Sequence, residues 1–251
     1  MKTAILLLLA SLLAVANVKA QRPDTLATRV EARQFIVPVA LTAAGSLGSA
    51  SHWWRQHIDS EVDHAIGSHR SWRIAEGAEW LPYAAQIGLG AIGVDARCGI
   101  VDRTLLSVTS FVILEAITQP VKRVVGRRRP DGSDNRSFPS GHTATAFAGA
   151  ELMRLTYGNA WGAAGYTVAA GVAAMRMAGR HHWLSDCIAG AGIGILSARA
   201  ATWLLPLERR LLRLDRRQGG ASASTTSRSY ELAVVPAASP RAVGCTILLT
   251  L

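Results

Sequence analysis

The chain has 251 residues, of which 49% are hydrophobic and 18% are charged, and its formal net charge is +10. Soluble domains carry roughly 25% charged residues, so this composition favours a membrane protein over a typical soluble domain. The basic residues flank apolar stretches without an aromatic platform or a zinc motif, which argues against nucleic acid as a partner. The three cysteines, Cys98, Cys187 and Cys245, have no metal-type spacing and are odd in number, which argues against a zinc site or a disulfide framework.

The N-terminus has the pattern of a secretory signal peptide. Met1 and Lys2 precede an apolar run from Ala4 to Val18, and a small residue, Ala20, ends the segment. We expect residues 1–20 to be a signal peptide, with an uncleaved membrane anchor as the alternative. In either case the chain is exported.

Residues 21–79 are expected to form an N-terminal segment with short apolar and amphipathic helices. The apolar stretch Phe35 to Ala50 has 16 residues, short of the roughly 20 that cross a bilayer upright. The stretch Ser51 to Glu79 alternates apolar and charged residues at helical spacing, which predicts one amphipathic helix at a membrane interface. Its four histidines lack a compact i, i+4 pair backed by a carboxylate, so we expect no metal site there.

Residues 80–206 contain further apolar stretches of helical length. They predict an all-α helical bundle, with about five or six membrane-embedded helices in the whole chain. The stretches are Leu81 to Val94, Leu105 to Val125, Thr143 to Tyr157, Ala160 to Met177 and Trp183 to Leu205. Several contain charges, namely Glu115, Glu151, Arg154 and Arg199, which in a bilayer would have to face the bundle interior or reach an interface.

Residues 207–251 are expected to be a basic stretch, a linker and a tail. The basic stretch follows Pro206 and suits anionic lipid on the cytoplasmic side. Gly219 to Ser227 has the composition of a flexible linker. Two β-prone runs, Tyr230 to Val235 and Ala242 to Leu251, predict a small C-terminal β-hairpin.

A basic cluster closes the stretch before Pro130. Lys122 and Arg129 are seven residues apart, which is two helical turns, so both are expected to point toward one anion at the end of a helix. Arginine offers a planar fork for two phosphate oxygens, and lysine offers a mobile point charge. We interpret Arg123, Arg127 and Arg128 as flanking charge beside a membrane.

Two further clusters carry histidines. Ser140 is well placed to cap a helix whose free backbone N–H groups would meet an anion, Gly141 allows close approach, and His142 could give a proton to a leaving oxygen. His182 and Asp186 are spaced i, i+4, so we expect the carboxylate to accept the Nδ1–H and leave Nε2 as a nucleophile.

Arg176 precedes His182 and Asp186 in the sequence and supplies another guanidinium across a turn expected at Gly179. His181 lacks an i+4 carboxylate and receives no role.

Together the clusters read K-x6-R-P, P-S-G-H and R-x5-H-x3-D. This order resembles the tripartite signature of the type 2 phosphatidic acid phosphatase family, which includes bacterial class A acid phosphatases and vanadium haloperoxidases. The resemblance covers roughly residues 105–205. It implies phosphate binding by a set of five residues and catalysis by three others. The phosphate-binding residues are Lys122, Arg129, Ser140, Gly141 and Arg176, and the catalytic residues are His182 as nucleophile, Asp186 as its orienting group and His142 as proton donor. One departure is Met175, where the family usually has serine.

The resemblance implies a metal-independent phosphatase that needs no cofactor and works through a phosphohistidine. We expect a phosphomonoester or diphosphate of a lipid as substrate, such as a phosphatidate, a polyprenyl diphosphate or a lipid A phosphate. The expected place is a bacterial inner membrane, with the site facing the periplasm. The alternatives are a soluble periplasmic acid phosphatase of low specificity, a vanadate-dependent haloperoxidase, and a non-enzymatic basic membrane protein that binds anionic lipid.

Overall fold

The computed structural model describes residues 30–66, 74–214, 231–239 and 242–250. The predicted signal peptide and the linker at Gly219 to Ser227 lie outside these ranges. The chain divides into two compact units, Met1–Glu208 and Arg209–Leu251. The division that we expected at residues 20, 79 and 206 stays a prediction.

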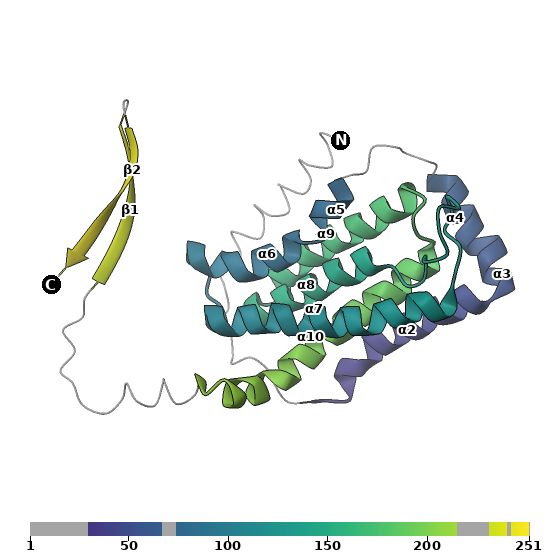
Figure 1. Ribbon diagram of the computed structural model, residues 1–251, viewed down its shortest axis with the longest axis horizontal. Helices are drawn as coiled ribbons and strands as arrows, with labels where there is room; N and C mark the ends of the chain where they lie inside the picture. Colours follow the sequence, from purple (N-terminus) through teal and green to yellow (C-terminus); the bar gives the residue numbers. More distant parts are fainter. Residues whose placement is uncertain (1–29, 67–73, 215–230, 240–241, 251) are drawn as a thin grey trace. The chain divides into compact units, whose positions relative to one another are not determined.

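The first unit is a helical bundle, as the sequence predicted (Figure 1). Its long helices run roughly alongside one another, and α8 is buried along most of its length. Helix α8 packs against α6, α7 and α9. The helices of the bundle are α6 (Leu81–Gly88), α7 (Ile100–Val125), α8 (Gly141–Tyr157), α9 (Asn159–Ala178) and α10 (Leu184–Leu211).

Glycines let α10 approach α8 at backbone distance. A Cβ atom at Gly190 would collide with the carbonyl oxygen of Ser140, and one at Gly194 would collide with that of Ala144. The approach brings the start of α10 against the start of α8, where the backbone N–H of Ser140 donates to the carbonyl oxygen of Asp186 at 3.1 Å. The glycine-rich part of α10 therefore holds the second and third sequence clusters together.

The amphipathic stretch after residue 50 is helical over His52–Ile66 and over Ile74–Ala78, and residues 67–73 lie outside the described ranges. Helix α2 (Arg33–Ala50) is followed, after a bend of 84°, by α3 (His52–Trp54), the π-helical turn η1 (Arg55–Asp59) and α4 (Ser60–Ile66). Helix α5 (Ile74–Ala78) leads into α6, and the 3-10 turn η2 (Leu89–Ile92) follows α6.

Helix α7 ends earlier than the spacing of the basic cluster suggested. It ends at Val125 because Gly126 adopts a left-handed conformation with φ of 57° and donates its backbone N–H to the carbonyl oxygen of Lys122. Arg129 therefore lies on the following loop and not two helical turns along the same helix. The expectation that one helix presents both cations is wrong, although both reach the same cavity.

Three of the four charges inside the predicted apolar stretches pair with one another, whereas Glu115 accepts a hydrogen bond from Gln119 at 2.7 Å. The carboxylate of Glu151 is 1% exposed and accepts hydrogen bonds from Arg154 at 2.7 and 2.8 Å and from the Tyr166 hydroxyl at 2.6 Å. Arg199 forms a further ion pair with Glu151 at 2.8 Å. These groups face the bundle interior, as expected for charges on apolar helices.

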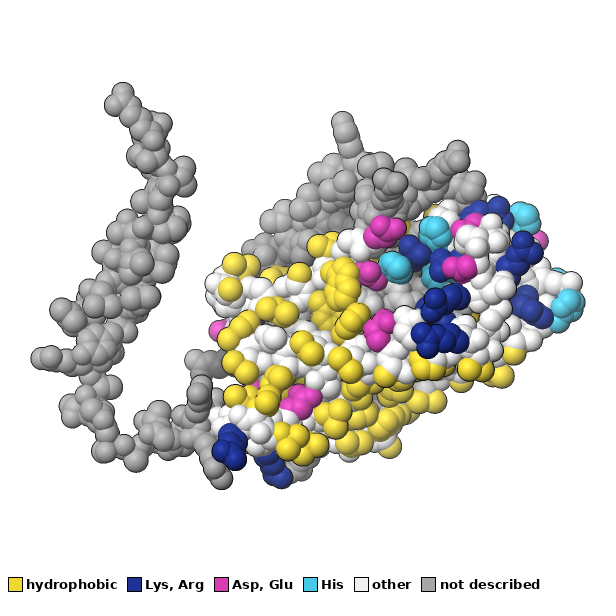
Figure 2. Space-filling model, in the orientation of Figure 1, with side chains coloured by type: hydrophobic (Ala, Val, Ile, Leu, Met, Phe, Trp, Pro, Cys, Tyr) yellow, Lys and Arg dark blue, Asp and Glu magenta, His cyan; other side chains and the backbone are white. Residues whose placement is uncertain are grey.

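Within the described residues, α10 is long and apolar enough to cross a membrane, and α2 together with the segment His52–Ile66 also passes this test as a bent pair. The five or six membrane-embedded helices that we expected therefore stay a prediction. Figure 2 shows hydrophobic side chains spread over α7 and α2, with basic and histidine side chains gathered near α3 and α4. The exposed apolar residues include Ile36, Val37 and Leu47 of α2 and Val101, Val108 and Val112 of α7.

The second unit contains the predicted hairpin. Strand β1 (Glu231–Ser239) pairs antiparallel with β2 (Ala242–Thr250), and Glu231 lies opposite Thr250. The first strand continues through Pro236, which we had expected to end it.

Candidate active site

A cavity of about 390 Å³ opens at one end of the bundle. Its wall contains both cations and carboxylates, with two aromatic rings at one side. The lining residues are Glu79, Trp80, Phe111, Glu115, Gln119, Lys122, Arg129, Asp134, Arg136, Gly141, His142, Thr145 and Arg176. Five of the eight residues assigned from the sequence, namely Lys122, Arg129, Gly141, His142 and Arg176, thus line one cavity.

Lys122 is a buried cation that ties a loop to the cavity. Its Nζ donates to the carbonyl oxygen of Pro139 at 2.6 Å and to that of Arg136 at 3.1 Å. An ammonium group has three N–H donors, and these carbonyls use two. The third is available to an anion in the cavity.

Arg129 is held in place by the loop that carries it. Its Nε donates to Asp134 Oδ1 at 2.7 Å, and its backbone N–H donates to the carbonyl oxygen of Asp134 at 3.0 Å. The remaining guanidinium N–H groups can serve a ligand, because one carboxylate contact occupies only part of the fork.

Arg176 stands at the end of α9 with only 6% of its surface exposed. Its Nε is buried and has no hydrogen-bond partner within the described residues. A buried N–H group without a partner is costly, so this end of Arg176 favours a nearby acceptor such as an anion. Its backbone carbonyl accepts the N–H groups of His181 at 3.1 Å and His182 at 3.3 Å, so the anion site and the third cluster are joined through one residue.

Met175, the residue that departs from the family pattern, takes part in hydrophobic packing. It lies against a buried cluster that includes Ala146, Ala169 and Val172. A serine at this position would lose that packing.

The second cluster forms the N-terminus of α8, as predicted. Ser140 is the N-cap, and its Oγ accepts the backbone N–H of Thr143 at 3.4 Å. Its side chain is fully buried and lies outside the cavity lining, so it organises the helix start. At Gly141 an added Cβ atom would find Lys122 Cε at 3.8 Å as its nearest neighbour, which leaves room for a ligand against the backbone.

His142 lines the cavity from the first turn of α8. Its Nε2 lies 3.6 Å from Glu79 Oε1. Burial and the positive charge of Arg176 lower the pKa of His142 to about 3. The imidazole is therefore neutral at neutral pH before an anion binds.

His182 precedes α10, so the helical i, i+4 argument for its pairing with Asp186 is wrong. Its Nδ1 lies 2.7 Å from the carbonyl oxygen of Ser137 and 3.8 Å from Asp186 Oδ2, which is too far for a hydrogen bond. A carbonyl oxygen can only accept, so the proton sits on Nδ1 and the lone pair on Nε2. His182 therefore has the predicted tautomer, but its Nδ1–H donates to the carbonyl oxygen of Ser137 and not to Asp186.

The imidazole of His182 is 3% exposed. Burial lowers its pKa to about 4, and the charges of Lys122 and Arg176 act in the same direction. Since both cations line the cavity, His182 lies within electrostatic range of it and is neutral at neutral pH.

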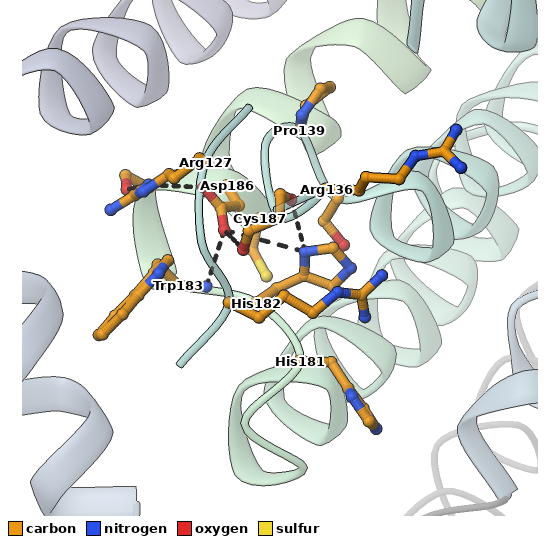
Figure 3. Close-up of polar contacts among 12 residues, drawn as sticks. Arg127, Arg136, Pro139, His181, His182, Trp183, Asp186 and Cys187 are labelled. Atoms are coloured by element: carbon orange, nitrogen blue, oxygen red, sulfur yellow. Dashed lines mark hydrogen bonds and ion pairs between the residues drawn. The ribbon is translucent and has the colours of Figure 1, made fainter. Parts of the chain in front are cut away.

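Asp186 is fully buried and organises the loop around His182 (Figure 3). Its carboxylate accepts hydrogen bonds from Arg127 Nη1 at 2.5 Å, from the Trp183 backbone N–H at 2.9 Å and from the Ser137 hydroxyl. Through Ser137 and Trp183 it fixes the two segments that flank the imidazole. Asp186 thus orients His182 indirectly.

Arg127 is not flanking charge, contrary to our interpretation. Its side chain is 9% exposed and lies between two buried carboxylates, Asp186 and Asp59, with Nη2 donating to Asp59 Oδ2 at 2.8 Å. Asp59 also accepts the backbone N–H of Ser185 at 3.0 Å and its hydroxyl at 2.7 Å. The π-helical turn is therefore connected to the third cluster.

His181 stays outside this network. Its Nδ1 lies 3.3 Å from Asp131 Oδ2, and the ring points away from His182 and Asp186 (Figure 3).

Glu79, Trp80 and Phe111 are cavity residues that the sequence did not identify. The ring centroids of Trp80 and Phe111 lie 5.1 Å apart, forming an aromatic wall. Glu79 is 9% exposed, and burial raises its pKa to about 7 despite the opposing charge of Arg176. No local pattern indicated these residues, because they come from the segment between α5 and α6 and from the middle of α7.

Comparison with known proteins agrees with the sequence signature. The PAP2 superfamily matches residues 103–210, a range that contains all three clusters. This match supports a relationship of residues 103–210 to the type 2 phosphatidic acid phosphatase superfamily.

A curated relative, described as lipid A 1-phosphatase from Porphyromonas gingivalis, is 35% identical over 139 residues, covering 54% of this chain. The chain spans only 31% of the length of that relative. Among solved structures, a crystal structure of Aquifex aeolicus LpxE is similar with a TM-score of 0.45 and 20% identity, covering 57% of this chain and 94% of the other.

Proposed function

We propose that this chain is a phosphoric ester hydrolase that acts on a phosphorylated lipid. The observation that carries the proposal is the buried guanidinium of Arg176, whose Nε is unpaired among the described residues, in a cavity shared with Lys122 and Arg129. Three convergent cations at a helix N-terminus form a site for a phosphoryl group, whose negative charge they neutralise. The name of the Porphyromonas gingivalis relative supports a phosphatase acting on a lipid.

The proposed reaction has two steps. Nε2 of His182 attacks phosphorus, the bond to the leaving oxygen breaks, and His142 gives that oxygen a proton. Water, which loses a proton to His142, then attacks the phosphohistidine and releases phosphate. A neutral His182 with its lone pair on Nε2 suits this role, because the nucleophile needs no prior deprotonation.

The aromatic wall supports a substrate with an apolar portion. Trp80 and Phe111 border the same cavity as the cations, so a phosphate held by Arg176 would place its leaving group near these rings. Exposed apolar side chains of α7, such as Val108 and Val112, extend from this helix toward the surroundings. A phosphatidate, a polyprenyl diphosphate and a lipid A phosphate all combine an anionic head with apolar chains.

We place the protein in a bacterial cell envelope, in or on the inner membrane, with the cavity on the periplasmic side. The exposed apolar surface of α2 and α7 supports membrane contact. A soluble periplasmic acid phosphatase is the second candidate. It is favoured because, among the described helices, α10 alone passes as a single span, and 67% of its apolar window is buried inside the bundle.

One experiment separates the two candidates. Membrane and soluble fractions of expressing cells are assayed with a lipid phosphate and with a water-soluble aryl phosphate, with and without EDTA. We expect activity on the lipid phosphate in the membrane fraction and no loss with EDTA. Activity confined to the soluble fraction would support the acid phosphatase, and activity in neither fraction would contradict both.

A further inference from the structure

Three carboxyl groups line the cavity: Asp134 accepts a hydrogen bond from Arg129 and Glu115 accepts one from Gln119, whereas Glu79 faces His142. Glu79 lies between α5 and α6 and lines the cavity that Lys122, Arg129 and Arg176 make basic. An ionised carboxylate there would repel an incoming phosphate. Glu79 therefore suits a role in which its carboxyl group is protonated during part of the catalytic cycle.

The nearest titratable partner of Glu79 in the cavity is His142, with Oε1 and Nε2 3.6 Å apart. Glu79 also experiences the charges of Arg176 from α9, Glu115 from α7 and Glu76 from α5. Of these, Arg176 favours the carboxylate, whereas burial and the two acids favour the protonated form. His142 faces the cations Arg176, Lys122 and Arg129, which disfavour its charged form.

We propose that Glu79 holds the proton that His142 delivers to the leaving oxygen. Nε2 is the ring nitrogen beside Glu79, which assigns Nδ1 to the leaving group. The inference rests on the proposed function, because it describes the acid of that same reaction. Glu79 acts through His142 and is a positioning residue that sets its protonation.

The proton balance closes over the two steps. In the first step, the N–P bond to His182 forms and the P–O bond to the leaving group breaks. The leaving oxygen takes the proton from Nδ1 of His142, and Nε2 takes the proton from Glu79. In the second step, water gives a proton to Nδ1 of His142 while its oxygen bonds to phosphorus and the N–P bond to His182 breaks. Nε2 of His142 then returns its proton to Glu79. His142 need not become an imidazolium, which agrees with its low pKa of about 3.

The distance of 3.6 Å exceeds that of a hydrogen bond, so a small closure is required for transfer. Catalytic contacts are often long in the ligand-free state and shorten when substrate binds. Entry of a phosphate beside Arg176 also removes the attraction that this cation exerts on the Glu79 carboxylate, which favours the protonated form at the moment of binding.

The test compares leaving groups of different basicity. Glu79→Gln, Glu79→Asp and the control Glu76→Gln are assayed on an alkyl lipid phosphate and on 4-nitrophenyl phosphate, whose leaving group needs no proton. Glu76 is exposed and lies on α5 close to Glu79 in the sequence, so Glu76→Gln removes the same charge from a neighbouring position. Removing general acid catalysis typically costs about 10²–10⁴-fold. We expect Glu79→Gln to lose about 10²-fold in kcat/KM on the alkyl substrate and less than about 10-fold on the aryl substrate, with Glu79→Asp in between.

Glu76→Gln should change the ratio of the two rates far less than Glu79→Gln, because it removes only the weakest of the charges that act on Glu79. The wild type gives an independent reading that needs no variant: relative to the aryl substrate, its kcat/KM on the alkyl substrate should fall as pH rises through about 7, where Glu79 loses its proton. Equal losses on both substrates, unchanged rates in Glu79→Gln, or a ratio independent of pH would overturn the inference. A wild type that hydrolyses neither substrate would instead contradict the proposed function.

Discussion

Nδ1 of His182 lies 2.7 Å from the carbonyl oxygen of Ser137, whereas the carboxylate of Asp186 lies 3.8 Å from the same nitrogen. The backbone therefore sets the tautomer of the proposed nucleophile. Asp186 acts on the loop, through the Ser137 hydroxyl and the Trp183 N–H. The geometry of His182 consequently depends on whatever keeps Asp186 in place, above all on Arg127.

Replacing Arg127 with alanine should be strongly destabilising. The substitution leaves the carboxylates of Asp59 and Asp186 buried without their shared cation. Removing one partner of a buried ion pair typically costs about 3–5 kcal/mol. Thermal or denaturant unfolding in detergent would measure this.

The matched control is Arg128→Ala, which removes an exposed guanidinium from the adjacent position. It should change stability by less than about 0.5 kcal/mol. Equal stability of the two variants would show that the buried network at Arg127 does not hold the loop.

Two glycine substitutions should change stability in opposite directions. At Gly194 of α10, an added methyl group meets the backbone of Ala144, so Gly194→Ala should cost about 1–3 kcal/mol through forced separation of α8 and α10. At Gly171 of α9 an added Cβ atom meets nothing within 4 Å, so Gly171→Ala should stabilise by about 0.5–1 kcal/mol. A Gly194→Ala protein as stable as the wild type would contradict the close approach of the helices.

Stability should fall in mild acid because of His182. Its pKa is about 6.5 when exposed and about 4 in the folded protein, so the unfolded chain binds the extra proton first. The contribution is fully present above pH 6.5 and is lost as the pH falls toward 4, about 3 kcal/mol in total. Unfolding measured between these pH values should show a steeper decline in the wild type than in His182→Asn. Parallel declines would contradict the burial of a neutral imidazole.

Trp80 should distinguish lipid from water-soluble substrates. Trp80→Ala removes part of the aromatic wall while leaving the cations of the cavity in place. We expect KM for a lipid phosphate to rise about 10-fold, in line with the 1.5–3 kcal/mol that a buried large apolar side chain typically contributes. The rate on a small aryl phosphate should change little. An equal loss of activity on both substrates would show that Trp80 stabilises the fold and does not select the lipid.

The features that depend on a local pattern could be predicted from the sequence. Ser140 caps α8 where the capping pattern placed it, and the three clusters meet at one end of the bundle. Two spacings that assumed a continuous helix are wrong, because Gly126 ends α7 before Arg129 and His182 lies before α10. At both positions the chain forms a turn where the residue spacing had predicted a continuous helix.

The residues that the sequence did not identify act across long separations. Asp59 and Arg127 are 68 positions apart, and their ion pair depends on how the π-helical turn meets the loop after α7. Glu79 likewise reaches His142 only because α5 and α6 lie against α8. Hydrophobic periodicity indicates which side of a helix is apolar. It does not indicate which charged groups on different helices will come into contact.

The central claim is that His182 carries the phosphoryl group, and direct trapping tests it best. The purified protein is mixed briefly with a radiolabelled lipid phosphate, quenched in alkali, which preserves phosphohistidine, and digested to locate the label. We predict label on the peptide that contains His182 in the wild type and none in His182→Asn. Label that persists in His182→Asn, or turnover by that variant at the wild-type rate, would contradict the account.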